Sequence, residues 1–434
     1  MKFLKRVLII TYYWAPSGGA GVQRWLKFVK YLREFGWEPF VYAPENPEYP
    51  SEDLSFEKDI PPGLEILKTP IWEPYDIYRK LSGRKGEKIN AGFISENRKS
   101  GWKDKLSIWV RGNFLIPDPR KFWIKPSVNF LTDHLKKNPV DAIVSTGPPH
   151  SMHLIGLELK KQFPKISWIA DFRDPWTNID FYNDLNLTCL ADKIHHRLER
   201  KVVRSADCVL VVSSDMKREY QALHPKRIEL ITNGYDADDL EVTALQPDKK
   251  FSLSHIGTLN TARNPKTLWK VLGELSKEHA DFSQDLQINL IGKTDFSVIE
   301  EVKNKGLLLN LNKIDYVSHN EAVILQKSSQ ILLLLIDNSA NAKGILTGKF
   351  FEYLAAQRPI LAIGPTDGDV AEVLRETNAG AIVDFDDEAK TKELIKNFYN
   401  KFKSGNLKIS SKSIEKYSRK ALTEQLAVVL DDLR

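Results

Sequence analysis

Apolar and polar residues follow two recurring patterns along the chain. Short apolar runs bounded by polar or turn residues predict buried strands, and stretches with apolar residues every three or four positions predict helices between them. In the first half, helices such as 21–35 and 151–163 alternate with predicted strands at 6–12, 38–43, 141–145, 167–171 and 207–212. Strands that alternate with helices are typical of parallel α/β architecture.

The same pattern restarts after residue 240, where a polar stretch follows ITNGYDADDL. A helix is predicted at about 264–278, and strands are predicted at 251–257, 286–292, 314–317, 331–336, 359–364 and 380–385. We therefore expect two Rossmann-like domains, 1–240 and 241–411, whose parallel sheets face a central cleft. A last helix within 412–434 is expected to pack back on the first domain.

Residues 72–126 lack clear periodicity and mix many basic side chains with tryptophan and phenylalanine. Segments this long inside a domain are usually functional or mobile. Basic residues beside tryptophan suit a bilayer surface, where aromatic rings lie at the level of the headgroups. An ordinary insertion that uses its aromatic residues as core explains the composition equally well, and the sequence leaves both interpretations open.

Composition narrows the function only coarsely. The chain has 434 residues and a formal net charge of +6, which permits contact with anionic lipid, nucleic acid or phosphorylated ligands and selects none. Its two cysteines exclude a disulfide framework and a cysteine metal cluster. The aliphatic run 331–336 falls far short of the roughly 20 residues that span a bilayer. We interpret the apolar N-terminal run, interrupted at Thr11, as a strand rather than a signal peptide, and expect a cytoplasmic protein.

A glycine-rich stretch, APSGGAGVQR at 15–24, follows the first predicted strand. A dinucleotide fingerprint requires a third glycine where Arg24 stands, and an acidic residue at the end of the next strand, which reads VYAP. A triphosphate loop fails because no Gly-Lys-Ser/Thr follows. What remains is a turn at Gly18, Gly19 and Gly21 that leads into a helix N-terminus and suits an anion or a closely approaching sugar, or else a tight turn without ligand. Arg24 is expected to face the mouth of the site or the solvent.

Six stretches in order along nearly the whole chain resemble glycosyltransferases of the two-Rossmann (GT-B) fold, close to glycosyltransferase family 4. They are YYWAPSGGAGVQRWLKFVKYL (12–32), STGPPHSMHLIGLELKK (145–161), WIADFRDPW (168–176), ITNGYD (231–236), SHIGTL (254–259) and LTGKFFEYLAAQRPILAIG (346–364). Each stretch is weak alone, but their order and spacing together are specific.

The last of these stretches predicts a helix that begins after Thr347 and Gly348. Its free N–H groups suit a diphosphate, with Lys349 adding positive charge. Lys349 and Glu352 are three residues apart and therefore neighbours on one helix face. The resemblance implies that Glu352 contacts the ribose of a donor nucleotide; a surface Lys–Glu pair is the alternative.

Two positions depart from the family pattern. Gly344 stands where the family often has a first glutamate near the donor sugar, and Thr258 stands where an arginine is usual. Arg263 then becomes the candidate for the leaving diphosphate, with Lys266 second. By position, the resemblance also places three residues around the nucleotide base: Gly292, Lys293 and Val317.

In the first half, His150 and His153 follow a strand and open a helix, which suits a proton shuttle or a ligand for a sugar hydroxyl. Asp171, in DFRDPW, is expected to point into the acceptor side of the cleft, unless it belongs to an internal salt-bridged turn. Two histidines at this spacing lack a nearby third ligand, so we expect no zinc site here. The failed dinucleotide fingerprint argues against a nicotinamide or flavin cofactor, and the resemblance implies catalysis without a metal.

The resemblance implies a glycosyltransferase that moves a sugar, with retention, from a UDP- or GDP-sugar to a glycan or lipid-linked acceptor in cell-envelope polysaccharide biosynthesis. Contact through 72–126 would then be with the inner face of the membrane. Two alternatives stay open: an epimerase or phosphorylase of the same fold, and a non-catalytic subunit that binds sugar nucleotides or glycans. No nucleic-acid-binding motif is present in the sequence, and nucleic acid is not an expected partner.

Overall fold

The protein is described by a computed structural model that covers residues 5–49, 52–74, 102–240, 246–315 and 317–434. Its chain divides into two compact units, one made of residues 1–232 and 420–434 and the other of residues 233–419. The boundary therefore lies near residue 232, where the sequence predicts 240, and the segment that returns to the first unit begins at Lys420 rather than at 412.

The first unit contains a seven-stranded parallel sheet with the strand order β3-β2-β1-β4-β5-β6-β7. The strands are β1 Lys5–Ile10, β2 Trp37–Pro44, β3 Glu65–Thr69, β4 Ala142–Gly147, β5 Ser167–Phe172, β6 Cys208–Val211 and β7 Ile228–Leu230. The helices are α1 Ala20–Leu32, α3 Trp102–Phe114, α4 Lys121–Lys137, α5 Ser151–Gln162, α6 Cys189–Ser205, α7 Ser214–Gln221 and α15 Arg419–Asp432.

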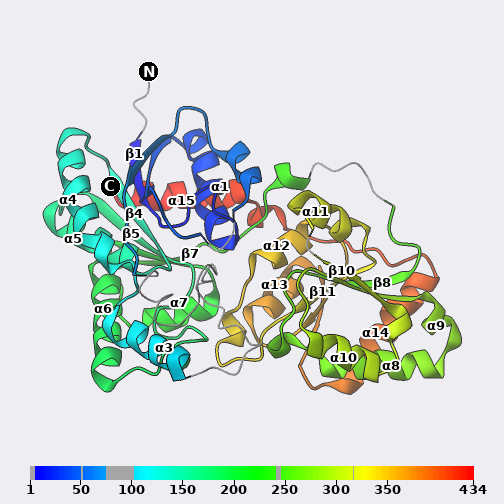
Figure 1. The fold of residues 1–434 in the computed structure, drawn as a ribbon. Coiled ribbons are helices and arrows are strands. Elements are labelled where there is room, and N and C mark those ends of the chain that lie inside the picture. The colour runs from blue at the N-terminus through cyan, green and yellow to red at the C-terminus, as the bar shows by residue number, and fades with distance from the viewer. Residues whose placement is uncertain (1–4, 50–51, 75–101, 241–245, 316) are drawn as a thin grey trace. The chain divides into compact units, whose positions relative to one another are not determined.

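Successive residues of β1 enter two different cores, because side chains alternate across a strand. Val7 and Ile9 face α1 and α15, whereas Leu8 and Ile10 face the cluster that contains residues of α4, α5, α6 and α7. Figure 1 shows α1 and α15 on one face of this sheet and α4 and α5 on the other. Burial on both faces explains why the central strands read as continuous apolar runs.

The second unit contains a six-stranded parallel sheet with the order β10-β9-β8-β11-β12-β13. The strands are β8 Phe251–Ile256, β9 Leu286–Ile291, β10 Leu311–Ile314, β11 Ile331–Leu335, β12 Ile360–Ile363 and β13 Gly380–Val383. The helices are α8 Lys266–Glu278, α9 Ala280–Asp285, α10 Phe296–Asn304, α11 His319–Ser328, α12 Gly348–Ala355, α13 Asp369–Thr377 and α14 Glu388–Lys403.

The predicted α/β class with two Rossmann-like domains is confirmed, and the differences concern edges and the insertion. The strand predicted at 314–317 is wrong, because β10 covers Leu311–Ile314 and Val317 lies outside any helix or strand, before α11. The strands β3, β7 and β10 are too polar or too short to form the apolar runs that predict strands, since edge strands are covered less.

The segment 72–126 is more regular than its sequence indicates. Residues 75–101 lie outside the described part, but α3 and the start of α4 are helical. Trp123 is buried in the first core, whereas Trp72, Phe114 and Phe122 are exposed. Among the aromatic side chains of this segment that the structure describes, Trp123 therefore belongs to the core and the others named here lie at the surface. No helix in the described residues is long and apolar enough to cross a bilayer.

Candidate functional site

Two glycines lie where β8 and β9 of the second unit end, and both adopt the left-handed backbone region. Gly257 has φ 127° and Gly292 has φ 108°. A Cβ atom on Gly292 would lie 2.8 Å from the carbonyl oxygen of Gly257, and one on Gly257 would collide with the ammonium of Lys349. Both positions therefore require glycine, and together they let Lys349 approach the backbone at the carboxyl edge of the sheet.

Lys349 occupies the first turn of α12, and its ammonium forms no hydrogen bond or ion pair with any residue that the structure describes. Burial, followed by the nearby charge of Arg263, lowers the pKa of Lys349 to about 8. The N-cap residue of this helix, Thr347, makes no side-chain capping bond, and open space lies in front of Gly348. An uncapped helix N-terminus beside an unpaired ammonium is suited to an anion.

Arg263, predicted to bind the leaving diphosphate, is not a free cation. Its guanidinium donates to Asp337 from Nε at 2.8 Å and from Nη2 at 2.7 Å. It belongs to a short 3₁₀ turn after β8, and Asp337 follows β11, so the pair joins two neighbouring strand ends. The positive charge near Lys349 is thus shared with a carboxylate, which leaves Lys349 as the stronger anion ligand of the two.

Glu352 lies one turn beyond Lys349 on α12 and is partly buried. It accepts a hydrogen bond from Nε2 of Gln326 on α11 at 3.1 Å, so α11 holds the carboxylate in place. Val317 packs at the edge of the neighbouring core. The Lys293 side chain is exposed, and its backbone carbonyl accepts a hydrogen bond from the backbone N–H of Leu259. The structure therefore gathers Gly257, Gly292, Lys349 and Glu352 at one edge of the sheet.

In the first unit, Asp171 is a structural residue rather than one that faces a cavity. Its carboxylate is fully buried and paired with Arg24, with Nη2 of Arg24 2.9 Å from Oδ1. Trp25 and Thr146 donate to the second oxygen at 2.7 and 2.8 Å. The prediction that Arg24 faces the mouth of the site or the solvent is wrong, and for Asp171 the alternative of an internal salt-bridged position is the correct one.

The two predicted histidines differ in accessibility. His153 is fully buried, its Nδ1 lies 3.0 Å from the hydroxyl of Ser145, and burial lowers its pKa to about 3. His150 lines a cavity and stacks on Trp176 with 4.6 Å between ring centroids and a 3° angle between planes. Burial, followed by the charges of His153 and other neighbours, lowers the pKa of His150 well below its ordinary value. Only His150 is placed to contact a ligand, as a neutral imidazole.

The glycine loop is fixed by a residue that the sequence does not single out for this role, Arg173. Its Nη1 donates to the carbonyl of Gly21 at 2.6 Å, and its other nitrogens donate to the carbonyls of Gly147 and Pro148. Gly18 is buried, whereas Gly19 is exposed with φ 96° and caps α1. Arg173 therefore holds the loop before α1 and the loop before α5, which carries His150, in one arrangement.

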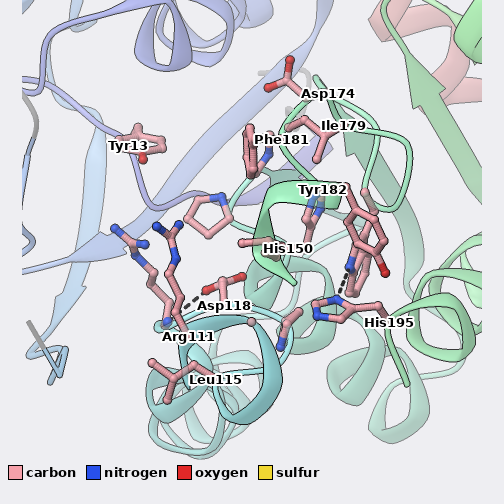
Figure 2. Close-up of a pocket in the computed structure, with 17 residues that line it drawn as sticks. Tyr13, Arg111, Leu115, Asp118, His150, Asp174, Ile179, Phe181, Tyr182 and His195 are labelled. Atoms are coloured by element: carbon pink, nitrogen blue, oxygen red, sulfur yellow. Dashed lines mark hydrogen bonds between the residues drawn. The ribbon is translucent and has the colours of Figure 1, made fainter. Parts of the chain in front are cut away.

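A cavity of about 240 Å³ lies beside His150, entirely within the first unit (Figure 2). Helices α3 and α6 and the loops after β1, β4 and β5 supply its walls. The polar lining residues are Tyr13, Arg111, Asp118, Arg120, His150, Asp174, Tyr182 and His195, and the apolar ones include Leu115, Trp176, Ile179, Phe181 and Leu185. The sequence missed most of these, because they come from separate segments with no common spacing; the DFRDPW stretch was the one signal that pointed to Asp174 and Trp176.

Comparison with known proteins agrees with this architecture. The family model described as Glycosyltransferase Family 4 matches residues 93–239, a range that includes α3 and nearly all of the cavity's lining. A search of curated proteins finds no match. The predicted resemblance is confirmed for the segment that the model covers.

Solved structures resemble the whole chain. Sucrose-phosphate synthase from Thermosynechococcus elongatus has a TM-score of 0.57 at 13% identity, with 99% of each chain covered. WaaG, a glycosyltransferase involved in lipopolysaccharide biosynthesis, has a TM-score of 0.51 at 12% identity, with 98% of this chain and 95% of the other covered. The putative UDP-N-acetylglucosamine 2-epimerase of Listeria monocytogenes has a TM-score of 0.55 at 10% identity, with 98% of this chain and 96% of the other covered. At these identities the structural likeness shows the GT-B fold, and the family match points to a glycosyltransferase.

Proposed function

We propose that this GT-B glycosyltransferase, with its family 4 segment at 93–239, moves a sugar with retention from a nucleotide-diphosphate sugar to a glycan or lipid-linked acceptor. In this reaction the bond between the anomeric carbon and the diphosphate oxygen breaks, and the oxygen of an acceptor hydroxyl takes its place. The diphosphate oxygen keeps the electron pair of the broken bond and takes up the proton of that hydroxyl, so the nucleoside diphosphate leaves as an anion.

The observation that carries this proposal is the unpaired ammonium of Lys349 beside the uncapped start of α12. A diphosphate there would receive backbone N–H donors and one positive charge, which stabilise the leaving group without a metal ion. Glu352, one turn further along the helix, would accept hydrogen bonds from the ribose hydroxyls. Gly292 and Val317 would border the base, and Lys293 would reach it only through a change of rotamer.

On the acceptor side, His150 and the Gly18–Gly21 loop are the candidates. His150 lines the cavity as a neutral imidazole and can accept a hydrogen bond from a sugar hydroxyl or donate one to it. His153 and Asp171 are buried and would act by positioning, since neither lines the cavity. UDP- and GDP-sugars both remain candidate donors, because nothing in the described pocket edge distinguishes the bases.

Cell-envelope polysaccharide biosynthesis at the inner face of the membrane is the setting we propose. WaaG, one of the similar structures, is involved in lipopolysaccharide biosynthesis, although its likeness to this chain extends to the fold alone. The independent support comes from exposed aromatic side chains on and beside the insertion: Trp72, Trp109, Phe114 and Phe122. Lys121 and Lys125 lie in the same stretch, and cations beside aromatic rings suit an anionic bilayer surface.

The proposal is tested first by thermal unfolding with UDP, GDP and their sugars. A ligand at about 100 times its Kd stabilises a protein by about 2.7 kcal/mol. We expect one nucleotide series to raise the midpoint in the wild type and to lose that effect in Lys349→Gln. The variant Lys270→Gln removes an exposed lysine on α8 and serves as the control that keeps the effect.

Product analysis separates the transferase from its alternatives. A transferase releases nucleoside diphosphate in proportion to acceptor consumed, whereas an epimerase converts the nucleotide sugar without needing an acceptor. A phosphorylase requires inorganic phosphate and releases a sugar phosphate. Binding of a nucleotide sugar with no turnover across a panel of acceptors would favour the non-catalytic subunit and contradict our proposal.

A further inference from the structure

The cavity of the first unit has one arginine without a partner. Arg111 lines it from α3, and its guanidinium forms no hydrogen bond or ion pair with any residue in the described ranges. Arg120, the other arginine of the lining, is already paired, with Nε 2.9 Å from Glu73 and the guanidinium over the ring of Tyr12. Arg111 is therefore the cation of this cavity that is available to a ligand.

Helix α3 is held rigidly where it carries Arg111. Next to it, Gly112 packs so closely that a Cβ atom would lie 2.7 Å from Leu187 and 2.9 Å from the carbonyl of Leu185. Asn113 accepts a hydrogen bond from the backbone of Thr188 at 2.7 Å. These contacts fix the end of α3 against the segment before α6, so the position of Arg111 is part of the cavity's construction.

The far side of the cavity is chemically different. Figure 2 shows Asp174 and Arg111 on opposite sides of the space, with His150 between them. The carboxylate of Asp174 forms no hydrogen bond or ion pair with the residues described. Trp176 supplies a flat wall, immobilised because its indole N–H donates to His195 at 3.1 Å and its backbone N–H to Tyr220 at 3.0 Å.

We propose that the cavity binds the acceptor and that this acceptor carries an anionic group, a phosphate or a carboxylate, which pairs with Arg111. The acceptor's ring or apolar portion would lie against Trp176, and its reacting hydroxyl would lie toward Asp174 and His150. That the ligand is the acceptor rests on the function proposed above; the selection of an anion rests on Arg111 alone. A planar guanidinium binds such oxyanions with two parallel hydrogen bonds.

The phosphate group of the acceptor could belong to either of two kinds of molecule, a soluble sugar phosphate or a lipid phosphate. Calorimetry on the full chain without donor distinguishes them, using glucose 6-phosphate and dodecyl phosphate below its micelle concentration as probes, with glucose and dodecanol as uncharged counterparts. Binding of glucose 6-phosphate supports a soluble phosphorylated acceptor, and binding of dodecyl phosphate alone supports a lipid-linked one.

The deciding variants are Arg111→Gln, which removes the charge, and Arg218→Gln, which makes the same change on an exposed helix of the same unit. We expect affinity for the phosphate probe to fall about tenfold or more in Arg111→Gln and to stay at the wild-type value in Arg218→Gln. Arg111→Lys should recover part of the loss. Equal affinity in Arg111→Gln and wild type, or no phosphate binding by the wild type, would overturn the inference.

Failure of this inference can be told apart from failure of the proposed function. Nucleotide binding is measured separately, by thermal unfolding of the wild-type chain with UDP and GDP. If a nucleotide stabilises the protein but phosphate binding does not depend on Arg111, the proposal of an anionic acceptor is wrong and the proposed transferase activity still stands. If phosphate binding depends on Arg111 but no nucleotide stabilises the protein, the anion site is supported and the proposed transferase activity is contradicted.

Discussion

The guanidinium of Arg24 and the carboxylate of Asp171 form an ion pair in the interior of the first unit, 2.9 Å apart and without exposure to solvent. Arg24 also donates to two backbone carbonyls that follow β7, at 2.8 and 2.9 Å. The pair therefore joins α1, β5 and the end of the first unit's sheet. Arg24 stands at the position where a dinucleotide-binding loop would need its third glycine.

We expect Asp171→Asn to lower the free energy of unfolding by about 3–5 kcal/mol, because it leaves Arg24 buried without a counter-charge. Urea denaturation measures this change. Thr146→Val, which removes a single hydrogen bond to the same carboxylate, should cost about 1 kcal/mol. If the two variants lose similar amounts of unfolding free energy, the ion pair with Arg24 is not the main stabilising interaction of Asp171.

The same pair sets a pH dependence of stability. Burial alone would raise the pKa of Asp171, but the charge of Arg24 and hydrogen bonds from Arg24, Trp25 and Thr146 outweigh it, so the pKa lies below its ordinary value. Its stabilisation is thus complete above the pKa of the unfolded chain and is lost as the pH falls through the lower folded pKa. Urea titrations across the acidic range should show a steeper loss for the wild type than for Asp171→Asn.

Lys349 predicts a pH dependence of nucleotide binding. With its pKa lowered to about 8, the side chain is charged at neutral pH and loses its proton just above it. Affinity for UDP or GDP should therefore fall as the pH rises through about 8, as measured by calorimetry, and Lys349→Gln should bind weakly with little pH dependence. A wild-type profile that stays flat from pH 7 to about 9 would contradict the assignment.

Lys349 also predicts a gain in stability when its charge is removed. Because the folded pKa lies below that of the unfolded chain, the charged form is disfavoured by folding, and stability should rise as the pH increases from about 8 towards about 10. Lys349→Met should raise the thermal midpoint at neutral pH while weakening nucleotide binding. A lower thermal midpoint together with weaker nucleotide binding in Lys349→Met would instead indicate that the variant is misfolded.

Glu352→Ala should weaken nucleotide binding without unfolding the second unit, because the side chain is only partly buried and, among the described residues, its hydrogen bond comes from Gln326. We expect a loss of about tenfold in affinity, the value of a hydrogen bond to a charged group. Gln326→Leu is the matched control, since it removes the supporting contact and leaves the carboxylate. Unchanged nucleotide affinity in Glu352→Ala would contradict the assignment of Glu352 as the residue that binds the ribose.

Arg173→Lys tests whether the bracing of the glycine loop matters for catalysis. Lysine keeps the charge but cannot donate to the carbonyls of Gly21, Gly147 and Pro148 together. We expect kcat to fall by about tenfold or more while nucleotide affinity in the second unit is unchanged. A fall in thermal stability without any change in kcat would assign Arg173 a structural role alone.

The exposed aromatic residues predict attachment to anionic bilayers. Trp109→Ser and Phe122→Ser together should reduce co-sedimentation with vesicles of phosphatidylcholine and phosphatidylglycerol, because each buried ring contributes on the order of 2 kcal/mol. Leu309→Ser, at a fully exposed leucine of the second unit, is the matched control. Equal sedimentation of wild type and double variant would exclude these rings as a bilayer contact.

Periodicity predicted the central strands well because each is buried on both faces by helices. The strands β1, β4, β5, β8, β9 and β11 all coincide with apolar runs. The polar strands β3 and β10 lie at sheet edges, where one neighbour is missing and no apolar run is required.

The candidate site was predictable only where a motif is local. Lys349 and Glu352 could be paired from their spacing on one helix, and the structure holds both at the edge of the second sheet. Arg111, Trp176 and Asp174 meet around one cavity although they come from separate segments. No spacing rule brings α3 to the loop after β5.

The sequence by itself determined the α/β class, the two Rossmann-like domains and the glycine positions at strand ends, because these depend on burial and backbone conformation that each short segment encodes. Only the tertiary structure decided which charged side chains are paired with one another. Arg24 faces inward because Asp171, 147 positions later in the chain, receives it there. Lys349 and Arg111 form no ion pair with the described residues, although Glu352 and Asp337 lie near Lys349 and Asp118 lines the same cavity as Arg111. Which charges are neutralised and which remain for a ligand depends on contacts between distant segments, and local pattern carries no record of them.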